Sequence, residues 1–209
     1  MAITEDRQPD WLELLSAGLT FDLKGFAPGV PIRAPGVNFS FDFEDMPPIP
    51  GFDVLHLLPG RHLAGGEASL PVVAAMLGLA RDMVRHFPEV EGVIWPASQS
   101  VIGRRFFESS ITAWLEGGAF PALGLTAFRE TMDGGLQSLG LSYFIGQELR
   151  IEPQLVADKV AATRLGIRLV NHLLLLGTLA REEHVIAPDG ARLVLVPSQN
   201  GKFIRVQPA

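Results

Sequence analysis

Strictly alternating apolar and polar residues mark one clear strand in the chain. In VNFSFDF (37–43), Val37, Phe39, Phe41 and Phe43 occupy every second position, with polar residues between them. Side chains of a β-strand point to opposite faces in turn, so this pattern is typical of a half-buried strand. Shorter apolar runs predict further strands at residues 19–23, 52–58 and 92–96.

Apolar residues recur at helical spacing in three longer segments. The first follows Ser69, an expected N-cap, has Pro71 in its first turn and ends before Pro88. The second covers residues 103–116, and the third covers residues 154–176, where the polar residues fall within one sector of the helix. A short helix is also predicted around Trp11–Ala17.

Turn residues divide most of the remaining chain into hairpins. MDGG (132–135) separates LTAFRE (125–130) from LQSLGLSYF (136–144). Asp-Gly and Asn-Gly pairs, which favour tight β-turns, lie in APDGA (187–191) and SQNGK (198–202). Together these elements predict an α+β fold with a mixed, largely antiparallel sheet, two or three packed helices and a β-rich N-terminal arm.

Proline is concentrated near the N-terminus. Eight of the 16 prolines fall within the first 60 residues, at positions 9, 28, 31, 35, 47, 48, 50 and 59. Proline lacks the N–H that a helix or a central strand requires. We therefore expect a single domain over residues 1–209, in which a proline-rich β arm (1–52) packs on an α/β core (53–209).

Composition and charge narrow the classes of function. The chain has no cysteine, which excludes thiol chemistry and disulfides and fits a cytoplasmic protein. Its formal net charge is −6 and no basic run is longer than Arg104-Arg105, so we expect no nucleic-acid partner.

Hydrophobic residues make up 47% of the chain, which raises the question of a membrane span. The most apolar stretch, residues 165–177, is interrupted by Arg168, Asn171 and His172. It falls short of the roughly 20 apolar residues that a spanning helix needs. We expect no membrane association, and we assign the surplus apolar residues to a large core or to the interface of a homodimer.

The segment EGVIWPASQSVIGRR (91–105) is the best candidate site. Its order predicts a strand, a polar loop and the start of a helix. Ser98, Ser100 and free backbone N–H groups at a helix N-terminus, with Arg104 and Arg105 one turn in, favour an anion. In a simpler interpretation, one serine caps the helix and the arginines are solvated.

His172 is a further candidate ligand-binding residue. It lies on the polar stripe of the helix predicted over residues 154–176. An imidazole at this position can contact a ligand, or it can serve as a hydrogen-bonded residue at the edge of the core.

No catalytic or metal-binding pattern is recognised in the sequence. Gly-x-Ser-x-Gly, the phosphate-binding loop and the dinucleotide-binding glycine pattern are absent, and neither His56 with His62 nor residues 182–184 match a metal-ligand spacing. Glu148 and Glu152 share a strand face but lie roughly 13 Å apart, by four residues of about 3.3 Å, so we interpret them as solvated strand-edge charges. We expect no catalytic residue, metal or cofactor.

Two segments carry a family resemblance. GVIWPAS (92–98) and SLGLSYFIGQELRI (138–151) resemble a family of uncharacterised bacterial α/β domains, in which Thr/Ser-x-Gly-Leu/Met precedes Phe-Gly-x-x-Glu-Leu/Ile. The matching positions are Ser138, Gly140, Leu141, Phe144, Gly146, Glu148 and Leu149, with Ile145 as an inserted residue. The resemblance covers residues 53–209 and implies the fold and a bacterial cytoplasmic setting, but no activity.

Two hypotheses for the function remain. The first is a non-catalytic binding or interaction domain, with a protein partner or a second copy of the chain, because no organised catalytic group is visible. The second is a small-molecule enzyme or ligand-binding protein for an anionic compound. It would use the junction at residues 95–105, with a contribution from Glu148 or His172.

Overall fold

The structure is a computed structural model that describes residues 11–209. The chain divides into two compact units, each built from two stretches of sequence. Unit 1 comprises the described residues up to Pro35 together with Pro47–Glu89, and unit 2 comprises Gly36–Met46 and Val90–Ala209. This division differs from the predicted arm and core, because residues within 36–46 pair with a strand of unit 2.

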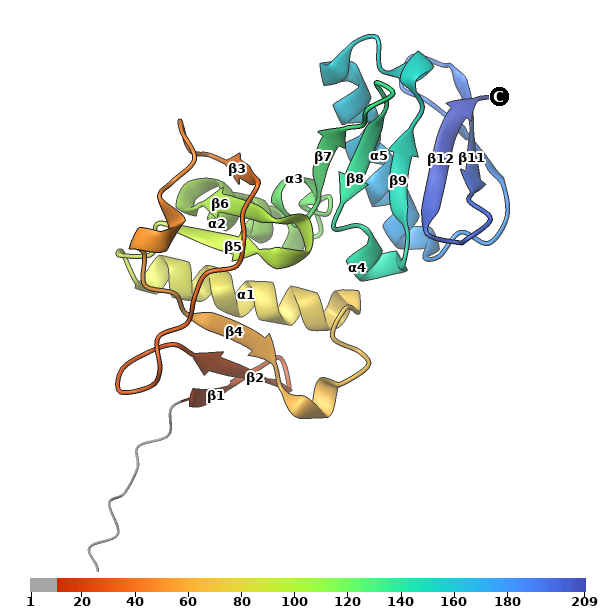
Figure 1. Cartoon of the computed structure of the whole chain (residues 1–209). Helices are drawn as coiled ribbons and strands as arrows, with labels where there is room; N and C mark the ends of the chain where they lie inside the picture. The colour runs from red at the N-terminus through yellow and green to blue at the C-terminus, as the bar shows by residue number, and fades with distance from the viewer. Residues whose placement is uncertain (1–10) are drawn as a thin grey trace, which may run out of the picture. The chain divides into compact units, whose positions relative to one another are not determined.

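Unit 1 is a three-stranded antiparallel sheet that packs against one helix (Figure 1). Its elements are β1 (Trp11–Ser16), β2 (Leu19–Lys24), η1 (Ile49–Gly51), β4 (His56–Pro59), η2 (Arg61–Leu63) and α1 (Leu70–His86), with the strand order β1-β2-β4. Phe21 of β2 and Val73 of α1 are fully buried. The helix predicted after Ser69 is confirmed, although the Ser69 side chain makes no capping hydrogen bond.

The helix predicted around Trp11–Ala17 is wrong, because this segment forms β1. Ala17 and Gly18 both have positive φ angles, 51° and 78°, and they form a two-residue turn between β1 and β2. Such a turn matches the twist of antiparallel strands. Six residues of β1 then pair with β2, from Trp11 opposite Lys24 to Ser16 opposite Leu19. Strand pairing thus overrides the short apolar pattern that indicated a helix.

Unit 2 contains a small three-stranded sheet with the order β3-β6-β5. Its elements are β3 (Phe39–Phe41), β5 (Gly92–Trp95), η3 (Pro96–Ser98), β6 (Ser100–Gly103), α2 (Arg104–Leu115) and α3 (Ala122–Leu125). β5 and β6 form an antiparallel hairpin, whereas β3 pairs with β6 in parallel. The strand predicted over residues 37–43 is therefore present, but shorter.

Unit 2 also contains a six-stranded sheet with the order β10-β11-β12-β9-β8-β7. Its elements are β7 (Ala127–Glu130), β8 (Leu136–Leu139), α4 (Ser142–Ile145), β9 (Glu148–Ile151), η4 (Pro153–Leu155), α5 (Lys159–Leu176), β10 (Glu183–Ile186), β11 (Arg192–Pro197) and β12 (Phe203–Pro208). β9 and β12 are parallel, and the other neighbours are antiparallel. The α+β class and the largely antiparallel pairing are confirmed.

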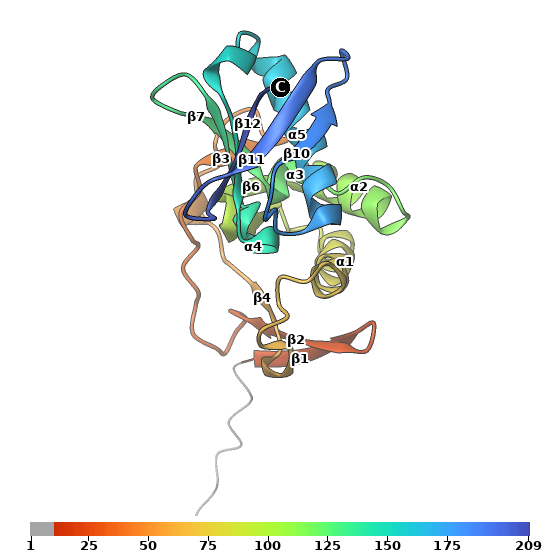
Figure 2. The ribbon, with the colours of Figure 1, turned by 90° about the vertical axis from the view of Figure 1, so that its right-hand side faces the viewer.

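Helix α5 covers one face of the six-stranded sheet (Figures 1 and 2). Its N-cap is Asp158, whose carboxylate accepts hydrogen bonds from the N–H groups of Val160 (2.8 Å) and Ala161 (3.1 Å). The buried side of α5 and the facing strands form the core of unit 2, with the side chains of Leu169, Val170, Leu173, Leu149, Ile151, Leu193, Leu195, Ile204 and Val206 almost completely buried. The third predicted helix is confirmed at this position.

No helix within residues 11–209 is long and apolar enough to cross a membrane.

A substitution at Gly166 tests the close contact between α5 and β7. A Cβ atom at Gly166 would lie 2.6 Å from Cε1 of Phe128. Alanine favours a helix over glycine by about 1 kcal/mol, but overpacking a core costs about 1–3 kcal/mol. We therefore expect Gly166→Ala to lower the free energy of unfolding by about 1 kcal/mol, measured by urea denaturation. With Phe128→Leu in place, the loss should disappear; an equal loss in both backgrounds contradicts Phe128 as its cause.

Candidate functional site

The structure separates the residues of the predicted anion site at 95–105. Ser98 ends the turn η3 and Ser100 is the first residue of the strand β6, which continues to Gly103, so neither serine is next to the start of α2 at Arg104. The predicted loop leading into a helix is therefore a hairpin followed by a helix. Both serines are fully buried, with 0% of their surface exposed.

The hydroxyl groups of both serines bond to neighbouring parts of unit 2. Ser98 Oγ lies 2.6 Å from the carbonyl oxygen of Gly124, to which it donates, and 2.9 Å from Ser100 Oγ. Ser100 Oγ lies 3.4 Å from the carbonyl oxygen of Ser98. These hydrogen bonds hold the hairpin turn against α3, which is a structural role.

The N-terminus of α2 is capped by a carboxylate of the protein itself. Asp42, just after β3, accepts a hydrogen bond from the N–H of Phe106 at 3.1 Å. Gly103 allows this approach, because a Cβ at that position would lie 2.6 Å from the Asp42 carbonyl oxygen. Arg104 donates to the carbonyl oxygen of Val90 at 3.2 Å. A negative charge thus already occupies the helix N-terminus where a bound anion was expected.

The four junction residues therefore do not converge on one cavity. Ser98 and Ser100 are buried, Arg104 is partly buried, and Arg105 is exposed. Anion binding by these four residues stays a prediction.

His172 lies instead in a groove between α5 and β10. The groove has a volume of about 370 Å³ and is lined by Leu165, Arg168, Leu169 and His172 of α5 and by residues 183–187. His172 Nε2 lies 2.9 Å from Glu183 Oε1, and both side chains are partly exposed. We call this region the α5–β10 groove.

The α5–β10 groove combines an apolar floor with an unpaired positive charge. Leu165, Leu169 and Val185 supply the apolar surface. Arg168 is exposed and forms no ion pair or hydrogen bond through its side chain with another residue in the described part of the chain. A concave apolar surface with a few polar groups is the usual form of a ligand site.

Glu148 is buried, with only 8% of its surface exposed, so its interpretation as a solvated strand-edge charge is wrong. Its carboxylate accepts hydrogen bonds from the hydroxyls of Ser138 and Ser142, at 2.5 and 2.7 Å. It also accepts from the backbone N–H groups of Gly140, Leu141 and Ser142. These bonds fix the turn that leads into α4, which begins at Ser142, whereas the sequence analysis predicts one strand over residues 136–144. The Ser-x-Gly-Leu-Ser pattern in the sequence was the available signal for this turn.

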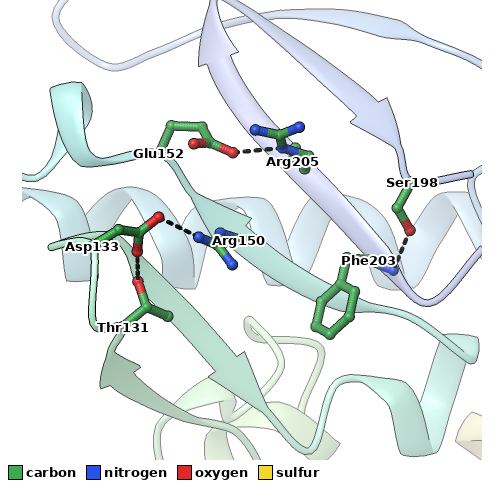
Figure 3. A network of polar contacts seen from close by, with 7 residues as sticks. All are labelled: Thr131, Asp133, Arg150, Glu152, Ser198, Phe203 and Arg205. Carbon is green, nitrogen blue, oxygen red and sulfur yellow. Dashed lines mark hydrogen bonds and ion pairs between the residues drawn. The ribbon is translucent and has the colours of Figure 1, made fainter.

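Glu152 is also only 8% exposed, so the same interpretation as a solvated charge is wrong for it. Its carboxylate lies 2.6 Å from Nε of Arg205, on the face of the six-stranded sheet opposite α5 (Figure 3). Arg150 lies 2.5 Å from Asp133 on the same face. The hydrogen bond and the charge of Glu152 raise the pKa of Arg205. Glu152 and Arg205 are far apart in sequence, so no local sequence pattern predicts that they form an ion pair.

The described residues, 11–209, do not form a cluster of metal-ligating side chains. Within residues 11–209, no group of three or more histidine, aspartate or glutamate residues is arranged to hold a metal. In the α5–β10 groove, His172 and Glu183 form a hydrogen-bonded pair.

Removing the Asp42 carboxylate tests the cap of α2. We expect Asp42→Ala to lower the free energy of unfolding by about 1–2 kcal/mol, because the helix loses a capping acceptor and a favourable charge. A smaller part of this loss comes from the backbone, since residue 42 has a φ of 63°, which aspartate tolerates better than alanine. Asp45→Ala, at an exposed aspartate three residues later, is the control and should change it by less than about 0.5 kcal/mol. Chemical denaturation measures both, and equal losses would contradict a capping role.

Asp133 gives a prediction for pH dependence. The Thr131 hydroxyl, and to a smaller extent the charge of Arg150, hold the pKa of Asp133 below its ordinary value (Figure 3). A lowered pKa gives stability that is present above the unfolded-state pKa and lost as the pH falls through the folded-state pKa. We expect Thr131→Val to raise the pKa of Asp133, measured by carboxyl NMR titration.

Thr163→Val is the matched control, because the Thr163 hydroxyl bonds to the Lys159 carbonyl oxygen on α5. This variant should leave the Asp133 titration unchanged. If Thr131→Val leaves it unchanged as well, the hydroxyl is not the cause of the lowered pKa.

Comparisons with known proteins identify no relative of the chain. Models of protein families, curated proteins and solved structures were compared with the chain, and none matches it. The resemblance of residues 53–209 to uncharacterised bacterial α/β domains therefore stays a prediction. The two segments behind it do meet in unit 2, since the rings of Trp95 and Tyr143 lie 5.3 Å apart.

Proposed function

We propose that the chain is a non-catalytic binding module whose unit 2 holds an anionic group in the α5–β10 groove. The observation that carries this proposal is the unpaired guanidinium of Arg168 beside the apolar side chains of Leu165, Leu169 and Val185. A guanidinium forms strong, charge-assisted hydrogen bonds with carboxylates and phosphates. The apolar floor would bury the non-polar part of the same ligand.

Binding is favoured over catalysis by the way unit 2 uses its buried reactive groups. The Ser98 hydroxyl donates to a backbone carbonyl, and the Glu148 carboxylate accepts from two hydroxyls and three backbone N–H groups. A nucleophile or a general base must reach the substrate. These groups are instead engaged in holding turns of the fold.

The proposed setting is the bacterial cytoplasm, which the absence of cysteine and the family resemblance support. A homodimer is an alternative use of the surface around the groove. Leu175 and Ile186 are 86% and 66% exposed, more than is usual for such large apolar side chains.

Titration with a simple probe tests the groove. We would add 4-phenylbutyrate, which carries one carboxylate and one apolar ring, and follow backbone amide shifts by NMR. Shift changes should concentrate at residues 165–172 and 183–187. The uncharged 4-phenylbutanamide should bind about fivefold more weakly or worse, as expected when a charge-assisted hydrogen bond is lost.

Two arginine variants make this test specific. Arg168→Ala should weaken the binding of 4-phenylbutyrate about fivefold or more. Arg105→Ala, at an exposed arginine of the junction, should leave it unchanged. Shift changes centred on residues 98–106, together with loss of binding in Arg105→Ala, would contradict the proposal and favour an anion site at the junction.

A further inference from the structure

β10 (Glu183–Ile186) is an outer strand of the six-stranded sheet with one open side. It pairs with β11, and no other strand in the described part of the chain pairs with it. The opposite outer strand, β7, carries the charges of Arg129 and Glu130, which protect a sheet edge from further pairing. β10 carries one acidic residue, Glu183, whose carboxylate is bonded to His172, and it presents Ile186, which is largely exposed.

The register of β10 shows which of its backbone groups face outward. The N–H of Ala187 donates to the carbonyl oxygen of Ala191 at 2.9 Å, next to the turn between β10 and β11. Hydrogen-bonded pairs alternate along an antiparallel ladder, so Val185 bonds across to Leu193. The backbone N–H and C=O groups of His184 and Ile186 therefore point to the open side, where another strand can bind.

A strand added to this open side would place every second side chain over the α5–β10 groove. Val185 is on the same face of the sheet as its partner Leu193, whose side chain is buried in the core beneath α5. Residues opposite each other on neighbouring strands share a face. A residue added opposite Val185 would therefore project over the groove, which is lined by Leu169 and Arg168.

The charges around the groove indicate an acidic occupant. Arg164 and Arg168 lie one helical turn apart on α5, both are exposed, and neither has a partner for its side chain among residues 11–209. Of the two arginines, Arg168 lines the groove and Arg164 lies just outside it. The one carboxylate that lines the groove, that of Glu183, is bonded to His172, and the exposed Glu182 lies outside the groove, directly before β10. Like charges at this spacing destabilise a helix slightly, and an acidic side chain on an added strand would neutralise them.

We infer that a partner protein binds by adding an extended acidic segment to the open side of β10, with an aspartate or glutamate side chain over the groove. This inference rests on the proposed function of the α5–β10 groove. Main-chain hydrogen bonds to His184 and Ile186 would supply affinity, and the groove would select the acidic side chain. The ligand is thus an extended peptide with one acidic residue over the groove, opposite Val185. A second acidic residue opposite Glu183 would be repelled, because Glu183 is on the same face of the sheet as Val185.

A second copy of the chain is a poorer occupant of the same edge. A two-fold pairing of β10 with itself, antiparallel and centred on Val185, would keep both α5 helices on one face of the joined sheet. The cationic residues Arg164 and Arg168 of the two copies would then face one another. Such a contact is repulsive, whereas an acidic segment is attracted.

The test uses a blocked hexapeptide of alternating valine and threonine in which one central threonine is replaced by glutamate, added to the full chain. We expect hydrogen exchange at the amides of His184 and Ile186 to slow about tenfold at saturation, because both would donate to the added strand. A peptide with glutamine in place of this glutamate should bind about fivefold more weakly or worse. Arg168→Ala should remove this difference between the two peptides, and Arg105→Ala should retain it.

Two further peptides distinguish strand addition from binding by side chains alone. One is N-methylated at the odd-numbered backbone positions and the other at the even-numbered positions, and we call these two patterns the two phases. One phase should bind about tenfold more weakly or worse than the parent, because it lacks the N–H groups that pair with β10. Equal binding of both phases would overturn strand addition and leave groove binding intact. If 4-phenylbutyrate binds the groove but the peptide does not, strand addition again fails alone; if neither binds, the proposed function fails as well.

The oligomeric state tests whether a second copy of the chain, and not a partner protein, binds to the open side of β10. His184→Pro removes an outward N–H of β10 and leaves its pairing with β11 in place, since proline is tolerated on an outer strand in this orientation. Sedimentation should show a monomer for the natural sequence. A dimer that His184→Pro dissociates would overturn the inference, because a second copy would then occupy the edge.

Discussion

The large sheet of unit 2 depends on the parallel pairing of β9 with β12. This pairing joins two antiparallel halves, β7-β8-β9 and β12-β11-β10. Parallel strands need a long connection, and here it consists of α5 and the β10–β11 hairpin. Leu149, Ile151, Ile204 and Val206 of the paired strands are fully buried. Because the same pair anchors both α5 and the hairpin, it also determines where the α5–β10 groove lies.

Most polar groups in the interior of unit 2 are satisfied by the fold itself. The buried hydroxyl of Ser98 and the buried carboxylate of Glu148 bind backbone and side-chain partners. At the surface, the exposed Asp42 caps α2. Buried polar groups without partners are costly, so this use of them is expected. Arg168 is not an interior group: it is exposed, it has no side-chain partner among the described residues, and it lies beside an apolar groove. Its position beside the apolar groove is the basis of the proposed ligand site.

Local patterns predicted the elements that depend on local interactions. The helices α1, α2 and α5 and the hairpins with Asp-Gly and Asn-Gly turns could be predicted, because apolar periodicity and turn residues act over a few positions. The segment at Trp11 could not, since six residues fit either a helix or a strand until a partner strand is known.

The candidate site was predicted only in part, for the same reason. His172 could be singled out on the polar stripe of α5, but its partner Glu183 and the groove arise only when β10 docks beside the helix. The burial of Glu152 depends on Arg205, which is brought close by the β9–β12 pairing. Ser98 and Ser100 were interpreted from the order of residues alone, which does not reveal that Ser100 begins a strand, β6, ahead of α2.

The insertion of residues 36–46 into unit 2 limits how the protein can be dissected. The chain passes between the two units three times, after Pro35, after Met46 and after Glu89. A gene fragment that begins at Val90 would lack β3 and Asp42, which would leave one side of β6 unpaired and the N-terminus of α2 uncapped. Unit 2 can be produced whole only if this short segment is supplied as a separate peptide or fused ahead of Val90 by a new linker.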